Sequence, residues 1–369
     1  MAAQAIRSES GGINEILPTQ TPIVTQFLLT KNRDRNSTQN SLDSTLPLVL
    51  MKGLIFSPDG RVHPCPGRFS MHLMPSLASP SRWISPAYRI FRIGFALSPL
   101  LLVHLALIAI PFVEFSWWYL LWILVLTRIT GLGVTVGLHR YCSHRSFKTP
   151  RWFQFLLAAA GCTALQKGPL WWSIHHRQHH RHSDEQGDPH SPVVDGFFHS
   201  HMGWLFTRDL MHPDESLVRD LARYPELVWL DRLWMLPGAL LAALCFAVGG
   251  WGGLVYGFCL CVVLTFQVTF AVNSIGHLFG RQRFNTGEGS RNNFLLGYIA
   301  MGDGWHNNHH RAPSSARHGF VWYELDLSYA FIQLLSVVGL AWDVKQPPAA
   351  SQKQATGSET NVGPGVQCP

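Results

Sequence analysis

The sequence predicts an all-α integral membrane protein with four transmembrane helices in two hairpins, capped by a cytosolic helical domain that carries the histidine groups. Only 14% of the 369 residues are charged, and the chain contains 14 Trp and 22 Phe. Low charge with abundant Trp is typical of membrane proteins. Four apolar stretches of suitable length occur, and the joint within each pair lacks Lys and Arg. These observations together predict the two hairpins.

The first hairpin is predicted at residues 93–113 and 117–138, because a membrane helix needs about 20 apolar residues. Trp117, Trp118 and Trp122 lie near the outer end of the second span, where Trp is enriched. Arg128 lies within this span and is expected to face protein or water. A packing role and a substrate contact are both open for it.

The second hairpin is predicted at residues 233–250 and 254–275, joined by a Gly-rich segment. Residues 152–170 are predicted to form an amphipathic helix at the membrane surface. A further apolar helix at 329–341 is too short to cross. These segments form one domain, residues 86–345.

The two ends of the chain are predicted to be disordered. Residues 1–85 are polar and rich in Ser, Thr, Pro and Asn, and they do not open like a secretory signal. Residues 346–369 are of low complexity. The seven scattered Cys predict free thiols, not a disulfide framework.

Charge predicts the orientation. Arg residues are frequent in residues 139–232 and again after His277, and basic loops stay in the cytoplasm. Both termini and all histidine groups are therefore expected in the cytosol, with the protein in a bacterial inner membrane or the endoplasmic reticulum. The net charge of +7 fits a lipid surface, and no nucleic-acid motif accompanies it, so no nucleic-acid partner is expected.

Three histidine groups lie along the chain: HRYCSH, HHRQHH and HNNHH. In the second, His176, His179 and His180 stand at i, i+3 and i+4, which share one face of a helix. The third group repeats this spacing, and His277 stands between them. Nine imidazoles exceed the needs of one metal and suit two metals with four or five nitrogens each. Imidazole binds iron, zinc, copper and nickel, so ligand type leaves the metal open.

The spacing of His139 and His144 does not keep both on one face of an α-helix. Either the helix ends near Arg140, or the two histidines serve different metals. Polar residues nearby are candidates to orient the imidazoles; they are Asp184, Asp188, Asp303 and Asn307. Turn formation, as in Asp188-Pro189, is the alternative role for such residues.

The three groups, in this order and around two hairpins, resemble the membrane fatty acyl desaturases of the stearoyl-CoA Δ9 type. LHRYCSHRSF, GDPHSP, FFHSHMGWLF, NSIGH and GDGWHNNHHRAPSSARHGFVWYELD extend the resemblance over roughly residues 90–344. It implies two iron ions, with the following ligands: His139, His144, His176, His179, His180, His277, His306, His309 and His310. It also implies that Asn273 holds a water on one metal. The additional histidines His175, His182, His190, His199 and His201 are not expected to be ligands.

The resemblance implies O2-dependent formation of a cis double bond, at Δ9, in a saturated acyl-CoA or acyl-lipid. No haem, Rossmann or ferredoxin motif is present, so a separate ferredoxin or cytochrome b5-type donor is expected. A related hydroxylase or ketolase would share the metals but insert oxygen. A metal transporter is a weaker alternative. Transporters bind their substrate near the bilayer midplane, whereas the histidine groups of this chain are expected at the cytosolic ends of the spans.

Substrate contacts are predicted from charge and apolarity. Arg140, Arg145, Arg177 and Arg281 are candidates for the substrate headgroup, although they could equally hold lipid phosphates or an acidic partner. The acyl chain is expected to enter between the spans. Leu132, Val136, Phe266 and Phe270 would suit the wall of such a tunnel.

Overall fold

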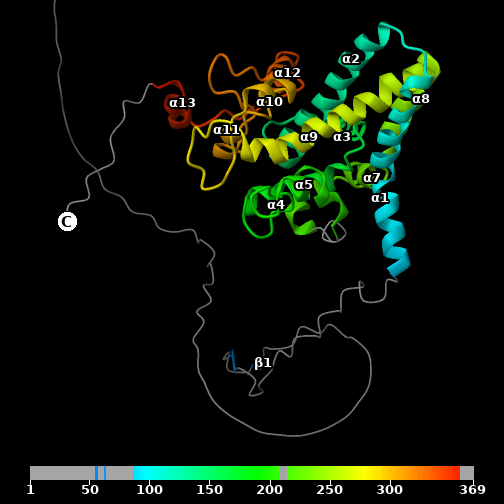
Figure 1. Ribbon diagram of the computed structural model, residues 1–369. Helices are drawn as coiled ribbons and strands as arrows, with labels where there is room; N and C mark the ends of the chain where they lie inside the picture. Colours follow the sequence, from blue (N-terminus) through cyan, green and yellow to red (C-terminus); the bar gives the residue numbers. More distant parts are fainter. Residues whose placement is uncertain (1–54, 57–61, 64–85, 208–213, 358–369) are drawn as a thin grey trace, which may run out of the picture. The chain divides into compact units, whose positions relative to one another are not determined.

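The computed structural model describes residues 55–56, 62–63, 86–207 and 214–357. The chain divides into two units, Met1–Ser76 and Leu77–Pro369. In the first, β1 (Ile55–Phe56) pairs antiparallel with β2 (Val62–His63). The prediction of disorder for residues 1–85 otherwise lies outside the described residues. In the described part of the second unit, the regular elements are all helices (Figure 1).

The first apolar pair forms α1 (Pro86–Ala106), the 3-10 helix η2 (Leu107–Phe112) and α2 (Trp118–Leu132). Pro111 interrupts the helical hydrogen bonding in η2. Without a break, α2 continues into a π-helix, η3 (Gly133–Ser143). The combined helix Trp118–Ser143 is long and apolar enough to cross a membrane.

The second apolar pair forms α8 (Met235–Gly252), the π-helix η7 (Gly253–Cys259) and α9 (Leu260–Leu278). Gly250 has φ +57° and ψ −146°, outside the helical region. A Cβ on Gly253 would clash with the carbonyl oxygen of Cys245, eight residues earlier. In a straight helix, two residues that far apart would be separated by about 12 Å. The chain therefore folds back at Gly250 and forms the predicted helical hairpin.

The segment Met235–Leu278 is also long and apolar enough to cross a membrane, while Leu97–Phe112 is a shorter apolar helix. The segments predicted to span the membrane are thus helical. The number of times that the chain crosses the membrane stays a prediction. Arg128 is exposed on α2, so it does not pack inside this chain, and the expectation that it faces protein or water stays a prediction.

The predicted surface helix at 152–170 is instead two helices, α3 (Arg151–Cys162) and α4 (Pro169–His182). Between them Leu165 and Lys167 have positive φ values of 56° and 74°, which end helical geometry. Shorter elements follow: α5 (Phe197–His201), η4 (Gly203–Phe206), η6 (Glu215–Val218), α6 (Arg219–Ala222) and α7 (Pro225–Arg232).

After α9 the chain forms α10 (Phe294–Ile299), α11 (His306–Arg311), α12 (Leu327–Val337) and α13 (Ala349–Thr356). The short apolar helix predicted at 329–341 is α12. The prediction of a disordered tail is wrong for α13, because Ser351 is 2% exposed and accepts a hydrogen bond from Arg311 Nε at 3.3 Å. Residues 358–369 lie outside the described part. The five cysteines in that part are free and buried, as predicted.

Two apolar clusters hold this unit together. In the first, η3, α3, α7 and α12 pack around Cys142, Leu157, Leu227 and Ile332. In the second, α1 and α9 pack with Trp204 and Leu205. Helix α2 lies beside α9, α8 packs on η7, and α11 contacts α9 (Figure 1). His179 of α4 lies 5.0 Å from His277 at the C-terminal end of α9, measured between ring centroids. The histidine-bearing segments therefore meet at one end of the helical hairpins.

Candidate metal centre

The π-helix η3 brings His139 and His144 to the same site. The N–H of His144 donates to the carbonyl of His139 at 3.2 Å, the i to i+5 bond of a π-turn. Neither alternative from the sequence is correct, because the helix does not end at Arg140 and the two histidines belong to one group. Wider turns place residues five apart on one face, as α-helical turns do for residues four apart.

The second histidine group lies on α4 and the third on α11. Both helices are regular, so their i, i+3 and i+4 spacing turns the imidazoles toward a common centre. His277 is at the last turn of α9. Four helical elements that are distant in sequence thus contribute to one buried site.

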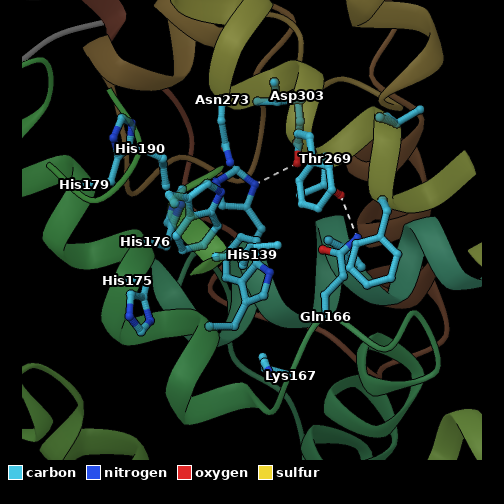
Figure 2. Close-up of a pocket in the computed structure, with 18 of the residues that line it drawn as sticks. His139, Gln166, Lys167, His175, His176, His179, His190, Thr269, Asn273 and Asp303 are labelled. Atoms are coloured by element: carbon cyan, nitrogen blue, oxygen red, sulfur yellow. Dashed lines mark hydrogen bonds and ion pairs between the residues drawn. The ribbon is translucent and has the colours of Figure 1, made fainter. Parts of the chain in front are cut away.

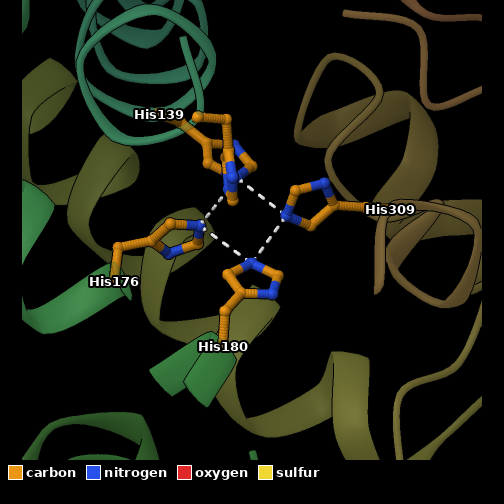
Figure 3. A group of neighbouring side chains, drawn as sticks. His139, His176, His180 and His309 are labelled. Atoms are coloured by element: carbon orange, nitrogen blue, oxygen red, sulfur yellow. Dashed lines mark hydrogen bonds between the residues drawn. The ribbon is translucent and has the colours of Figure 1, made fainter. Parts of the chain in front are cut away.

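The nine predicted ligands form two groups, within each of which one nitrogen per histidine lies within 4.8 Å of the others. One group has five members: His139, His144, His176, His180 and His309. The other has four members: His179, His277, His306 and His310. Figure 3 shows four members of the first group with their rings directed at one another.

The Nε2 atoms meet in both groups. In the first group His144–His176 and His180–His309 are separated by 2.7 and 2.9 Å, and in the second group His277–His306 by 3.0 Å. Nitrogens bound at about 2.1 Å to one metal lie roughly 3.0–3.4 Å apart. The donor sets therefore fit two metal ions.

Carboxylates hold three of the rings from behind. Asp303 accepts from His139 Nδ1 at 2.8 Å, and Asp184 accepts from His277 Nδ1 at 2.9 Å. Asp188 accepts from His179 Nδ1 at 2.9 Å with either oxygen. A proton on Nδ1 leaves the Nε2 lone pair for a metal. The prediction that these three aspartates orient imidazoles is supported by this geometry.

Among the residues that the structure describes, the Asn307 side chain has no hydrogen bond to a histidine. Its Oδ1 accepts from the N–H groups of Arg283 and Phe284 at 2.8 and 2.7 Å, so it orders the loop before α10. Glu288, which the sequence analysis missed, lies 3.5 Å from His310 Nδ1 and 3.6 Å from His277 Nδ1. Glu288 stands eleven residues after His277 and outside the three histidine groups, so its spacing offered no signal.

Burial keeps many of the imidazoles neutral. Desolvation, reinforced by neighbouring histidines, holds the pKa values of His176, His180 and His309 well below 6.5. The pKa of Asp303 is lowered because His139 and Arg140 outweigh the opposing effect of burial. Neutral imidazole is the form that binds metals, so the protein environment favours ligation.

Two of the four arginines predicted to meet a substrate headgroup are instead held by the protein. Arg140 is fully buried and pairs with Asp303 at 2.9 Å and Asp326 at 2.8 Å. Arg177 donates to Asp220 at 2.6 Å and to the carbonyl of Ser143 at 2.8 Å.

Arg145 also pairs with Asp220, at 3.3 Å, while Arg281 is exposed. Sequence showed the charges of Arg140 and Arg177 but not their partners, most of which lie tens to hundreds of residues away.

His318 is a further buried residue that the sequence analysis did not single out. Its ring packs on His309 with 4.4 Å between centroids, and its Nδ1 lies 3.1 Å from both Arg140 and Asp303. It joins the frame that holds His139. A single histidine outside the three groups gave no spacing signal.

An apolar cavity runs alongside the histidines (Figure 2). His139, His176, His179, His306 and Asn273 line one part of it. Apolar side chains line much of the rest; they include Leu97, Leu100, Leu165, Leu205, Phe266 and Phe270. Of the four residues suggested for a tunnel wall, Phe266 and Phe270 line the cavity, whereas Leu132 and Val136 pack in the first apolar cluster.

Known proteins are similar in sequence to this chain over most of the described helical unit. The profile of the family "Fatty acid desaturase" matches residues 115–332. A palmitoyl-monogalactosyldiacylglycerol delta-7 desaturase of Arabidopsis thaliana is 40% identical over 263 residues, covering 70% of each chain.

Two further relatives differ in substrate. An sn-1 stearoyl-lipid 9-desaturase of Anabaena variabilis is 40% identical over 63% of this chain and 86% of its own length. An acyl-CoA 5-desaturase of Anemone leveillei is 38% identical over 68% of this chain and 79% of its own. The match over residues 115–332 and these identities show that the chain belongs to the fatty acid desaturase family, oxidoreductases that act on acyl chains.

Proposed function

We propose that this protein is an O2-dependent acyl desaturase that uses two iron ions to introduce a cis double bond into a saturated acyl chain. The observation that carries the proposal is the division of nine buried or half-buried histidines into groups of five and four beside an apolar cavity. A metal pair and a slot for an alkyl chain are the two parts that this reaction needs.

The chemistry favours a redox metal over acid–base catalysis. A methylene within an alkyl chain has no acidic proton and no leaving group, so side chains alone cannot break its C–H bond. Two reduced irons, when bound, supply the O2 activation that such a bond requires. The protein's part is to hold neutral imidazoles in place, exclude water with apolar walls and fix one methylene beside the metals.

The ligands in this proposal are the nine histidines of the two groups. Asn273 lines the apolar cavity beside the histidines and would hold a water on one metal. Asp184, Asp188 and Asp303 would orient His277, His179 and His139 through their Nδ1 hydrogen bonds.

The proposed setting is a membrane crossed four times by two hairpins, with the metal centre and both termini in the cytosol. Exposed apolar side chains on the hairpins support this, among them Leu121, Leu124, Leu240 and Leu244. Arg-rich segments flank the histidine groups, as cytosolic loops do. A bacterial inner membrane or endoplasmic reticulum fits this orientation, and two relatives from Arabidopsis thaliana are named as chloroplastic.

The substrate is proposed to be a saturated acyl-CoA or acyl-lipid, with the double bond at Δ9. Relatives named for 9-desaturation of stearoyl-lipid and palmitoyl-lipid support this position. Electrons would come from a ferredoxin or a cytochrome b5-type protein, because the sequence carries no electron-transfer motif of its own.

The test is expression in a desaturase-deficient host, followed by mass analysis of fatty acids. We expect a new monoenoic acid, lighter than its parent by two hydrogens, that disappears with His176→Ala. Gain of one oxygen would instead identify a hydroxylase. Unchanged fatty acids, despite inserted iron-loaded protein and a working electron donor, would contradict the proposal.

A further inference from the structure

The five-histidine group and the four-histidine group of the metal centre differ in the charge that surrounds them. Among the described residues, three carboxylates lie within 3.6 Å of Nδ1 atoms in the four-histidine group; they are Asp184, Asp188 and Glu288. In the five-histidine group, one carboxylate of the described residues does so, Asp303 at His139. The negative charge behind the two groups is therefore unequal.

A buried arginine offsets the single carboxylate of the five-histidine group. Arg140 is fully buried and pairs with Asp303 at 2.9 Å and with Asp326 at 2.8 Å. The three carboxylates at the four-histidine group have no ion pair with Lys or Arg in the part of the chain that the structure describes. Asp184, for example, accepts from Ser191 Oγ at 2.7 Å and from a backbone N–H at 2.8 Å. Their negative charge is thus left for the histidines.

Glu288 serves two of the predicted ligands at once. Its Oε2 lies 3.6 Å from His277 Nδ1, and its Oε1 lies 3.5 Å from His310 Nδ1. Ser290 fixes the carboxylate, because its N–H and its Oγ–H each donate to one oxygen at 2.6 Å. The side chain of Glu288 is 9% exposed, so water screens its charge only weakly.

Negative charge behind a ligand changes the preference of a metal between oxidation states. A carboxylate at Nδ1 makes the imidazole more basic, and the net charge and hydrogen bonds around an iron centre help to set its reduction potential. Fe3+ carries one more positive charge than Fe2+, so nearby carboxylates favour Fe3+ through Coulomb attraction. This effect is larger at the four-histidine group.

We propose that Asp184, Asp188 and Glu288 give the four-histidine site the lower reduction potential, so that it holds Fe3+ while the five-histidine site holds Fe2+ when one electron has left the pair. Glu288 is a positioning residue here, acting on the metal through His277 and His310. The inference rests on the proposed function for the identity of the metal, and it adds an order of oxidation. The electron passes to an external one-electron oxidant, which is ferricyanide in the test.

The test measures midpoint potentials on full-length protein that holds iron in one group at a time. His176→Ala leaves the four-histidine group complete, and His306→Ala leaves the five-histidine group complete. Each iron-loaded protein is reduced with dithionite, in detergent and without air, and is titrated with ferricyanide while the EPR signal of Fe3+ is recorded. We expect the lower potential in the His176→Ala protein.

Glu288→Gln separates charge from shape, because the amide keeps one oxygen that can accept from Ser290. In the His176→Ala protein it is expected to raise the potential by about 59 mV, which corresponds to a tenfold smaller preference for Fe3+ over Fe2+. In the His306→Ala protein the same change should leave the potential unaltered. Glu185→Gln changes an exposed carboxylate and is the matched control in both proteins.

Two further variants keep the test decisive. Glu288→Asp retains the charge and should hold the potential close to that of the parent protein. If Glu288→Gln does not retain its iron, Asp184→Asn answers the same question, because Asp184 accepts from His277 Nδ1 at 2.9 Å; it should also raise the potential of the four-histidine site alone.

The potentials decide this inference separately from turnover. Equal or reversed potentials in the two single-site proteins, or no rise on removal of a carboxylate from iron-loaded protein, overturn it. If the expected order and rise are found but the wild type makes no unsaturated product, the proposed function fails while the order of oxidation stands. If the wild type makes product and Glu288→Gln shifts both sites equally, the inference fails alone.

Discussion

His139 and Arg140 are adjacent in sequence and both bind Asp303, through Oδ2 at 2.8 Å and Oδ1 at 2.9 Å. One side chain belongs to the candidate metal centre and the other to the frame around it. Asp303 therefore couples the orientation of a proposed iron ligand to a buried ion-pair network that also includes Asp326.

Arg140→Met is expected to destabilise the fold, because it leaves Asp303 and Asp326 buried with a missing partner. Breaking such a pair costs about 3–5 kcal/mol, so thermal unfolding in detergent should occur at a clearly lower temperature. Arg128→Met, at an exposed position, is the control. An Arg140→Met protein of unchanged stability but weaker substrate binding would restore the headgroup role.

Asp188→Asn should weaken metal binding without removing a ligand. The carboxylate holds the His179 ring through Nδ1, and loss of such a partner typically costs about 10- to 100-fold in metal affinity or activity. Iron titration of the purified protein measures this. Asp195→Asn changes an exposed carboxylate and should leave affinity unaltered; equal affinities for both variants would count against the orienting role.

The two histidine groups should lose metal separately. His176→Ala removes a member of the first group and His306→Ala a member of the second. Each variant is expected to hold about one iron where the wild type holds two, and to make no unsaturated product. The number of iron ions per chain is measured by inductively coupled plasma emission spectroscopy, and His182→Ala is the control. Two irons retained in both variants would refute the assignment.

The π-helix should depend on two glycines that face α3. A Cβ on Gly137 would clash with the backbone of Leu157, and one on Gly133 with that of Ala160. Gly137→Ala is therefore expected to push η3 from α3, misplacing His139 and His144 and lowering both stability and iron content. Gly94→Ala, with open space around it, is the matched control and should be neutral.

Acid should destabilise the metal-free protein from about pH 6.5 downward. Burial, with the neighbouring histidines, lowers the folded-state pKa of His176, His180, His306 and His309 well below 6.5. Below pH 6.5 the unfolded chain binds protons that the folded chain excludes, which lowers the free energy of unfolding by up to about 1.4 kcal/mol per pH unit for each group. Above pH 6.5 these histidines are neutral in both the folded and the unfolded chain, so their protonation does not lower the free energy of unfolding.

The measurement is the unfolding temperature of chelator-treated protein between pH 8 and 5. Asp188 acts in the same direction at lower pH, because its folded-state pKa is depressed chiefly by His179 against the effect of burial. Its contribution is present above its unfolded pKa of about 3.9 and is lost as the pH falls further. A constant unfolding temperature from pH 8 to 5 would contradict the buried, neutral state of the histidines.

The sequence predicted which histidines the fold brings together, because their spacing is local. The i, i+3, i+4 spacing in α4 and α11 places the histidines on one face of any regular helix. The lengths of the apolar segments indicated where the long helices lie. The π-turn at His139–His144 was not predictable, since it depends on the close approach of α3 to Gly133 and Gly137. The same limitation explains the incorrect role of Arg140, whose carboxylate partners lie more than 160 residues further along the chain.

The helix α13 has a practical consequence for handling this protein. Ala355 packs near Phe284, Ala312 and Phe320, and Ser351 receives a hydrogen bond from Arg311, the residue that follows His310. The low complexity of the tail suggests truncation at residue 345. Such a truncation would remove these contacts from the helix that carries HNNHH. Expression vectors should keep the chain through Gly357 and attach purification tags beyond it.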